Sequence, residues 1–177
     1  HSLQHRGQES AGIVSSYFDE DRQKALMPMH KDFGLVLNVF NDHSIFTGKL
    51  KGRSAIGHNR YSTSGSSDNP SNIQPFRVHY SEGNLAIAHN GNLTNARELR
   101  RQFTEQGTLF SSTSDTELIL HLIAQSDEER QMDQIMDGLR QIKGAYCLVL
   151  LTDDKLIAVR DPNGFRPLAL GKKDGTF

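Results

Sequence analysis

The sequence predicts a layered α+β domain in which one sheet packs on another and helices cover the outside. Two observations predict this fold class. The strands expected near the two ends of the chain are apolar on both faces, as strands covered on both sides are. The segments between them carry amphipathic patterns of helical period, which suit helices lying on a sheet. A chain of 177 residues is long enough for one domain with a sizeable core.

Local signals define the elements of the first half. In chain order we expect the tail of a helix over 1–10 that stops near Gly7, a strand over 10–18, a turn over 19–24, a short helix over 32–40, a strand over 54–61, a loop over 62–72 and a strand over 76–80. Apolar spacing favours the helix at 32–40. The loop at 62–72 is rich in Ser, Gly, Asn and Pro, and it is long enough to be functional.

The second half alternates helices and strands. We expect a strand over 85–89, three helices, strands over 145–151 and 156–160, a type I turn over 161–164 and a strand over 168–170. Thr94 is expected to cap the first helix, residues 114–117 form a capping box for the second, and Ser126 repeats that signature for the third. Gly144 is expected to stop the third helix. Its inward residues are Met132, Ile135, Met136, Leu139 and Ile142.

Composition excludes several classes of function. Lys and Arg number 20 and Asp and Glu 21, so a net charge of −1 gives no reason to expect nucleic acid or an anionic membrane as a partner. A single cysteine excludes a disulfide framework and a cysteine metal site. The eight histidines show no metal-ligand spacing, and neither a membrane span nor a signal peptide is visible. We therefore expect a cytoplasmic protein and, because the chain opens within a motif at His1, a piece of a longer one.

The stretch 84–95 (NLAIAHNGNLTN) is the first candidate site. A short apolar run ends abruptly at His89, and Asn90 and Gly91 follow. One interpretation is an ordinary hairpin turn, for which Asn-Gly is the commonest signal. The other is an oxyanion hole, because Gly91 lets the backbone approach a ligand and Asn90 offers an uncharged NH₂ donor.

Two charged residues complete a possible substrate site. Arg60 ends a strand just before the polar loop, where it can either clamp a carboxylate or form a surface ion pair. Asp115 lies in the first turn of a helix, where it can either complement the helix dipole or bind an ammonium group. Thr63 and Ser64 on the loop can add hydroxyl or backbone contacts, or serve turn chemistry alone. Together these residues suit an amino acid that bears an amide or ester.

The chain shows no nucleophile. Cys147 lies in the apolar run GAYCLVLL, where a cysteine behaves as a small hydrophobe. A reactive thiol needs exposure and a nearby positive charge. We expect Cys147 to be buried and inert.

Four runs resemble the glutaminase domain of class II glutamine amidotransferases, which belong to the N-terminal nucleophile hydrolases. They are 5–12 (HRGQESAG), 57–63 (GHNRYST), 88–92 (AHNGN) and 114–117 (SDTE). The runs 5–12, 72–76 (NIQPF) and 161–168 (DPNGFRPL) favour the amidophosphoribosyltransferase branch. In the glucosamine-6-phosphate synthase branch, the position of Ser64 is usually His. The resemblance extends along the whole chain.

The resemblance implies a four-layer αββα sandwich and specific residue roles. Arg60 would hold the glutamine carboxylate and Asp115 its ammonium group, Thr63 and Ser64 would line the pocket, and Asn90 with the Gly91 N–H would form the oxyanion hole. Arg6 resembles the family arginine near the nucleophile. That nucleophile is an N-terminal cysteine, with its own α-amino group as base.

The resemblance also implies what the whole protein does. Ammonia released from glutamine would pass to a phosphoribosyltransferase domain, which needs Mg²⁺, and displace pyrophosphate from phosphoribosyl pyrophosphate (PRPP). This is the first committed step of purine synthesis. Some family members carry an iron–sulfur cluster, on which this stretch is silent, and a homo-oligomer is expected.

The sequence departs from the family pattern at both ends. Residues 1–177 would be a partial glutaminase domain, because the nucleophile with its strand belongs before His1 and the transferase domain after Phe177. The fragment alone is expected to be inactive. The alternatives are the glucosamine-6-phosphate synthase type of amidotransferase and a glutamine-binding module that has no nucleophile.

Overall fold

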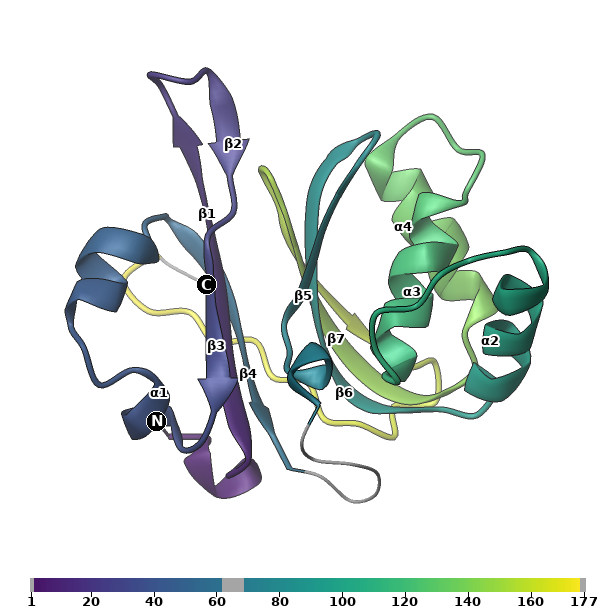
Figure 1. Ribbon diagram of the computed structural model, residues 1–177, viewed down its shortest axis with the longest axis horizontal. Coiled ribbons are helices and arrows are strands. Elements are labelled where there is room, and N and C mark those ends of the chain that lie inside the picture. Colours follow the sequence, from purple (N-terminus) through teal and green to yellow (C-terminus); the bar gives the residue numbers. More distant parts are fainter. Residues whose placement is uncertain (1, 62–68, 176–177) are drawn as a thin grey trace.

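Two antiparallel sheets of four strands each face one another in the computed structural model, which describes residues 2–61 and 69–175 (Figure 1). The first sheet is built around β1 (Ser10–Asp19), which pairs with β2 (Lys24–Leu26) and β3 (Met29–Phe33) on one edge and β4 (Ser54–Arg60) on the other. The second sheet has the order β5 (Phe76–Tyr80), β6 (Gly83–Leu93), β7 (Gly144–Thr152) and β8 (Leu156–Arg160).

Helices cover the outer face of both sheets. The second sheet carries α2 (Ala96–Glu105), α3 (Asp115–Ala124) and α4 (Gln131–Gln141). The first sheet carries only the short α1 (Val36–Val39) and a single π-helical turn at Ile45–Lys49. The order of layers is therefore helix, sheet, sheet, helix, and the αββα sandwich is confirmed with one thin outer layer.

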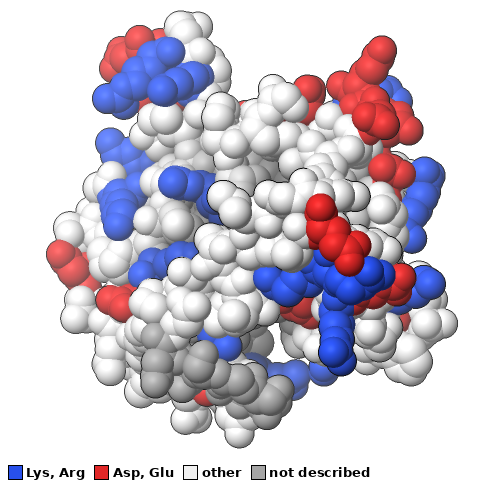
Figure 2. Space-filling view, turned by 45° about the vertical axis from the view of Figure 1, so that its right-hand side comes forward, with Lys and Arg blue, Asp and Glu red and all other residues white. Residues whose placement is uncertain are grey.

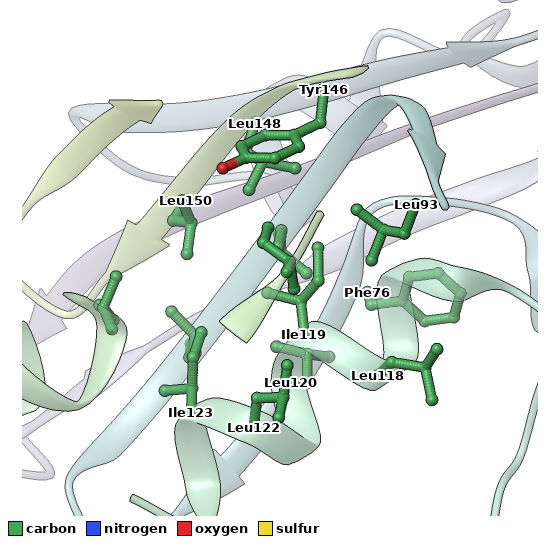
Figure 3. Close-up of a cluster of buried hydrophobic side chains, with 14 of the residues drawn as sticks. Phe76, Leu93, Leu118, Ile119, Leu120, Leu122, Ile123, Tyr146, Leu148 and Leu150 are labelled. Atoms are coloured by element: carbon green, nitrogen blue, oxygen red, sulfur yellow. The ribbon is translucent and has the colours of Figure 1, made fainter. Parts of the chain in front are cut away.

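The larger hydrophobic core lies between the second sheet and its helices. Figure 3 shows Leu148 and Leu150 of β7 facing Ile119 and Ile123 of α3. All four side chains are fully buried. Because alternate residues of a strand point to opposite faces, this one stripe of β7 anchors the helical layer.

The smaller core lies between the two sheets. Its buried members are Val14, Met27, Ile56, Ala86, Ala88 and Leu151. The alanines of β6 contribute little bulk, which lets the sheets approach closely. Gly12 of β1 also lies close to the segment just before β5, since a Cβ there would lie 2.3 Å from the Gln74 carbonyl oxygen. Alternate residues of β6 thus belong to different cores: Leu85 and Ile87 to the larger one, and Ala86 and Ala88 to the smaller one.

Two predictions of secondary structure from the sequence are wrong. Only Val36–Val39 of the predicted helix 32–40 is helical, because Asp32 and Phe33 pair with β1 as part of β3. Residues 168–170 form no strand, and Leu170 is 80% exposed. Strands β2 and β3 were not predicted.

The predicted helix starts are right in only one case. Ser114 caps α3 by accepting the Thr116 N–H, as the capping-box signature indicates. Asn95 takes the N-cap position of α2, and Thr94 instead donates its hydroxyl to the Lys143 carbonyl.

The limits of α4 also differ from the prediction. The helix begins after Arg130 rather than near Ser126, and it ends at Gln141, so Gly144 instead opens β7. Met136 is 48% exposed instead of facing inward, whereas Ile135 and Ile142 are buried as expected.

None of the helices within residues 2–61 and 69–175 combines the length and hydropathy that crossing a membrane requires.

Truncation of Leu148 tests the core. Leu148→Ala should lower the free energy of unfolding by about 2–5 kcal/mol, because a fully buried leucine leaves a cavity. Leu156→Ala on β8 is the matched control, since that side chain is 53% exposed. Chemical denaturation of the chain, followed by circular dichroism, measures both. Equal losses would show that the β7 stripe does not anchor the helical layer.

Candidate active site

Strand β6 extends beyond the end of its neighbour β5. The pairing with β5 stops at Phe76 opposite Ile87, whereas the pairing with β7 continues to Leu93 opposite Gly144. The predicted Asn-Gly turn is therefore wrong: Asn90 and Gly91 continue the strand. Among the described residues, 88–93 have a strand partner on one edge only, and the groups on their other edge need other partners.

Gly91 has a backbone conformation that requires glycine. Its φ is +156°, and a Cβ would lie 2.1 Å from the Ala145 carbonyl oxygen and 2.9 Å from Nε2 of His89. The neighbouring strand β7 therefore passes too close for any side chain at this position. The structure therefore requires glycine at position 91 because of the neighbouring strand, and the close approach of a ligand to Gly91 stays a prediction.

Side chains from three other segments occupy the free edge of β6. The Gln74 Oε1 accepts the His89 N–H at 2.7 Å, and the Asp115 Oδ2 accepts the Leu93 N–H at 3.0 Å. His58 Nε2 donates to the His89 carbonyl oxygen at 3.2 Å, because a carbonyl only accepts. These three contacts replace the missing strand and fix the backbone on both sides of Asn90 and Gly91.

Asp115 is held as an oriented carboxylate. Ser114 caps the helix at the residue before it, so the main chain is fixed. One carboxylate oxygen accepts from Leu93, and the other lies 3.4 Å from His89 Nδ1. Burial alone would raise the pKa of Asp115, but contacts with His89 and the Leu93 N–H outweigh it and lower the pKa below its usual value. The side chain remains 21% exposed, so an ionised carboxylate still reaches solvent.

A second buried acid braces the segment that precedes Asp115. Glu117 accepts the backbone N–H and hydroxyl of both Ser111 and Ser112, at 2.7–2.8 Å. Burial raises the pKa of Glu117, but these hydrogen bonds lower it by more than burial raises it. The pKa of Glu117 therefore lies below its usual value. Arg100 donates to the carbonyls of Ser112 and Ser114 and stacks on Phe110. Glu117 thus serves the adjacent loop rather than the N-cap residue of a capping box.

Arg60 ends β4 with an unused donor. Its Nη1 is buried and has no hydrogen-bond partner among the described residues. A buried donor without a partner is available to bind an anion. Arg60 follows His58 by two residues, and His58 bonds to the residue before Asn90. The end of β4 therefore lies against the free edge of β6.

The other predicted site residues are less defined by contacts. Arg6 is exposed in the 3-10 turn Gln4–Arg6, beside Gly7, where a Cβ would lie within 2.8 Å of the Asn59 and Arg60 backbone. Thr63 and Ser64 lie outside the described residues. Asn90 is exposed and, as an alternate residue to His89, lies on the face of β6 that carries Ala86 and Ala88.

Cys147 pairs with Asn90 across β6 and β7 but shows no sign of activation. It is partly buried, not fully buried as predicted. Burial raises the pKa of its thiol, and the nearby Arg160 offsets only part of that effect. A raised pKa disfavours the thiolate, which supports the prediction that Cys147 is not a nucleophile.

Neither a metal-binding group nor the pocket described below involves the predicted site residues that the structure describes. No group of three or more His, Cys, Asp or Glu residues there suits a metal ion. An open pocket of about 770 Å³ is lined by Thr94, Asn95, Arg97, Glu98, Arg101 and Lys143. None of the predicted site residues lines it, and Figure 2 shows acidic and basic side chains interspersed over the face it draws.

Sequence reasoning assigned no role to His89, His58 or Gln74. All three lie within or beside runs that were singled out, yet their partners are 15–31 residues away in the chain. The one visible signal is His89, a polar residue directly after an apolar run, which turns out to be 4% exposed.

Adding a methyl group at Gly91 tests the close approach of β7. Gly91→Ala should lower the free energy of unfolding by about 2 kcal/mol or more, because of backbone strain and the clash with Ala145. Gly57→Ala is the control, since a Cβ there meets only ordinary contacts at 3.5 Å. Chemical denaturation compares the two, and a tolerated Gly91→Ala would contradict the geometry.

The burial of His58 predicts that the folded chain loses stability in acid. Burial lowers the pKa of His58 to about 4, below the ordinary value of 6.5. Between these values the unfolded chain binds more protons than the folded chain, so stability falls as pH drops from 6.5 towards 4. His58→Gln keeps a donor for the His89 carbonyl but does not titrate, and it should flatten that part of the stability profile. An unchanged profile would show that His58 is not buried in its neutral form.

Comparison with known proteins shows which family this chain resembles. The model of the glutamine amidotransferase domain matches residues 58–177. Amidophosphoribosyltransferase 1, chloroplastic, of Arabidopsis thaliana is 47% identical over 173 residues, which cover 98% of this chain and 29% of that protein. The amidophosphoribosyltransferase of Bacillus subtilis is 46% identical over 173 residues, covering 97% of this chain and 34% of that protein.

Solved structures agree as well. The glutamine PRPP amidotransferase from B. subtilis, complexed with ADP and GMP, superposes with a TM-score of 0.86 at 42% identity, over 98% of this chain and 36% of that chain. The chain thus spans about a third of the length of these relatives. Because the family model matches more than half of the chain, including Arg60, Asn90, Gly91 and Asp115, the chain belongs to the family of glutamine amidotransferase domains.

Proposed function

We propose that this chain is the glutaminase domain of an amidophosphoribosyltransferase. It would release ammonia from glutamine for transfer to PRPP, giving 5-phosphoribosylamine, the first step of de novo purine synthesis. The names of the relatives support this branch over the glucosamine-6-phosphate synthase branch.

One observation carries the proposal. The ionised Asp115 is fixed to the overhanging end of β6, beside Asn90 and Gly91, and the Arg60 guanidinium with its unpaired Nη1 ends the strand that bridges to the same edge. A guanidinium, a carboxylate and an amide donor on elements that meet at this one edge match the carboxylate, ammonium and side-chain amide of glutamine. Thr63, Ser64 and Arg6 would add contacts around that pocket.

Strand geometry supports the oxyanion role of Gly91. The N–H groups of His89 and Leu93 both point to the free edge of β6. Because N–H groups alternate along a strand, that of Gly91 belongs to the same edge, between two donors already engaged. With the Asn90 amide it would stabilise the oxyanion that forms when a thiolate attacks the glutamine carbonyl.

The reaction needs a nucleophile that this chain does not supply. We place it before His1, as an N-terminal cysteine whose α-amino group accepts the thiol proton. Its sulfur would bond to the amide carbon, the C–N bond would break to release ammonia, and water would then cleave the thioester to release glutamate.

The remaining parts of the proposal concern the whole protein. A phosphoribosyltransferase domain would follow Phe177 and bind PRPP with Mg²⁺, and an iron–sulfur cluster is left open. We expect a cytoplasmic homo-oligomer whose partners are small molecules rather than nucleic acid or membrane.

Removal of the Asn90 amide tests the oxyanion hole. Asn90→Ala in the full-length enzyme should reduce the glutaminase kcat by about 10²–10³ with a smaller change in KM, because the lost donor acts on the transition state. Steady-state release of glutamate measures this.

Asn92→Ala is the matched control, because Asn92 is also exposed and lies two residues further along the same face of β6. It should retain activity close to that of the unmodified enzyme. An equal loss in both variants would indicate damage to the strand, and full activity of Asn90→Ala would refute the assigned role.

A further inference from the structure

We propose that His89 is a positioning residue of the glutamine site: its Nδ1–H fixes the Asp115 carboxylate in the orientation that receives the α-ammonium group of the substrate. This inference rests on the proposed function. His89 is not placed in contact with substrate, and it acts through Asp115.

The side chain of His89 is enclosed and its proton is assigned by its neighbours. The imidazole is 1% exposed, with Nδ1 at 3.1 Å from Thr116 Oγ1 and 3.4 Å from Asp115 Oδ1. The contact with Thr116 Oγ1 is a hydrogen bond, and that with Asp115 Oδ1 is a longer ion-pair contact. Because an ionised carboxylate only accepts hydrogen bonds, we place a proton on Nδ1, facing Asp115. Nε2 is buried and has no hydrogen-bond partner within the described residues.

The backbone of His89 is also held on both sides. Gln74 accepts its N–H and His58 donates to its carbonyl, so the ring is attached to a peptide unit that cannot shift freely. The two supporting side chains come from different segments, one before β5 and one from the opposite sheet. Because the ring is fixed in this way, its Nδ1 constrains the side chains that it contacts, Asp115 and Thr116.

His89 links both halves of the proposed site. On one side it contacts Asp115, and on the other its Nε2 would lie 2.9 Å from a Cβ at Gly91, so the ring packs directly against that residue. The second oxygen of Asp115 is occupied by the Leu93 N–H. With His89 and Leu93 each engaging one oxygen, the carboxylate cannot rotate without breaking a contact, and its exposed lone pairs point in a fixed direction.

The alternative is that His89 serves packing alone. Its ring fills a buried site, and a purely structural residue would affect all ligands of the pocket alike. A positioning role predicts instead a selective effect on ligands that carry an α-ammonium group. L-Glutamate and glutarate differ only in that group, so the ratio of their inhibition constants separates the two possibilities.

Two substitutions at His89 place an amide at different ring positions. The His89→Asn side chain can present an NH₂ near the position of Nδ1, whereas His89→Gln presents it near Nε2, away from Asp115. Both are made in the full-length enzyme, and ammonia-dependent synthesis reports whether each variant is folded. Competitive inhibition of the glutaminase reaction by L-glutamate and by glutarate is then measured for each.

The expected result is a change in preference rather than a general loss. His89→Gln should reduce the preference for L-glutamate over glutarate by about tenfold, as for loss of a charged hydrogen bond, and leave the glutarate constant within about twofold. His89→Asn should retain most of the preference. The His89→Gln/Asp115→Asn double variant should show the same preference as Asp115→Asn alone, because both act through one carboxylate.

The controls separate failure of this inference from failure of the proposed function. If Asp115→Asn keeps the preference for L-glutamate, Asp115 does not bind the ammonium group and the proposed site is wrong. If Asp115→Asn loses it but His89→Gln weakens both inhibitors equally or keeps the preference, His89 is structural and the inference is overturned. If His89→Gln does not fold, His89→Leu, which fills the buried site without a donor, replaces it and is judged by the same two outcomes: a reduced preference supports the inference, and an unchanged preference overturns it.

Discussion

The unpaired edge of β6 is the constraint on which the rest of the site depends. A strand that outruns its neighbour leaves buried N–H and C=O groups that need partners, and here side chains supply them. Those side chains come from β4, from the segment before β5 and from the start of α3. Because these side chains bond to the β6 backbone, segments that are distant in the sequence meet there, and they bring Arg60 at the end of β4 and the carboxylate of Asp115 towards Asn90.

The two cores explain why this edge is accessible. Alternate residues of β6 pack against the other sheet or against the helices, so the strand is fixed on both faces up to Ala88. Beyond that point the small inter-sheet residues give way to the exposed Asn90. The proposed site thus lies at the end of a rigid strand, where its geometry is held by the fold and not by a loop.

The sequence allowed prediction of what local signals determine. Local patterns located β1, β4, β5, β7 and β8, and the Ser114 cap located the start of α3 and therefore Asp115. Asn90, Gly91 and Asp115 lie at or beside the free edge of β6, whereas Thr63 and Ser64 lie outside the described residues. What it did not predict depends on pairing between distant residues. Asn90 and Gly91 have the local signature of a turn, yet β7 pairs with them and extends the strand. His89 and Gln74 gain their roles only when β6 outruns β5.

A structure of the full-length enzyme with bound L-glutamate would test the central claim most directly. We expect the α-carboxylate of the bound glutamate at Arg60 and its ammonium group at Asp115. Its side-chain carboxyl oxygen should lie at the Asn90 amide and the Gly91 N–H. Glutamate bound elsewhere, for example in the basic pocket beside α2, with the free edge of β6 empty, would contradict it.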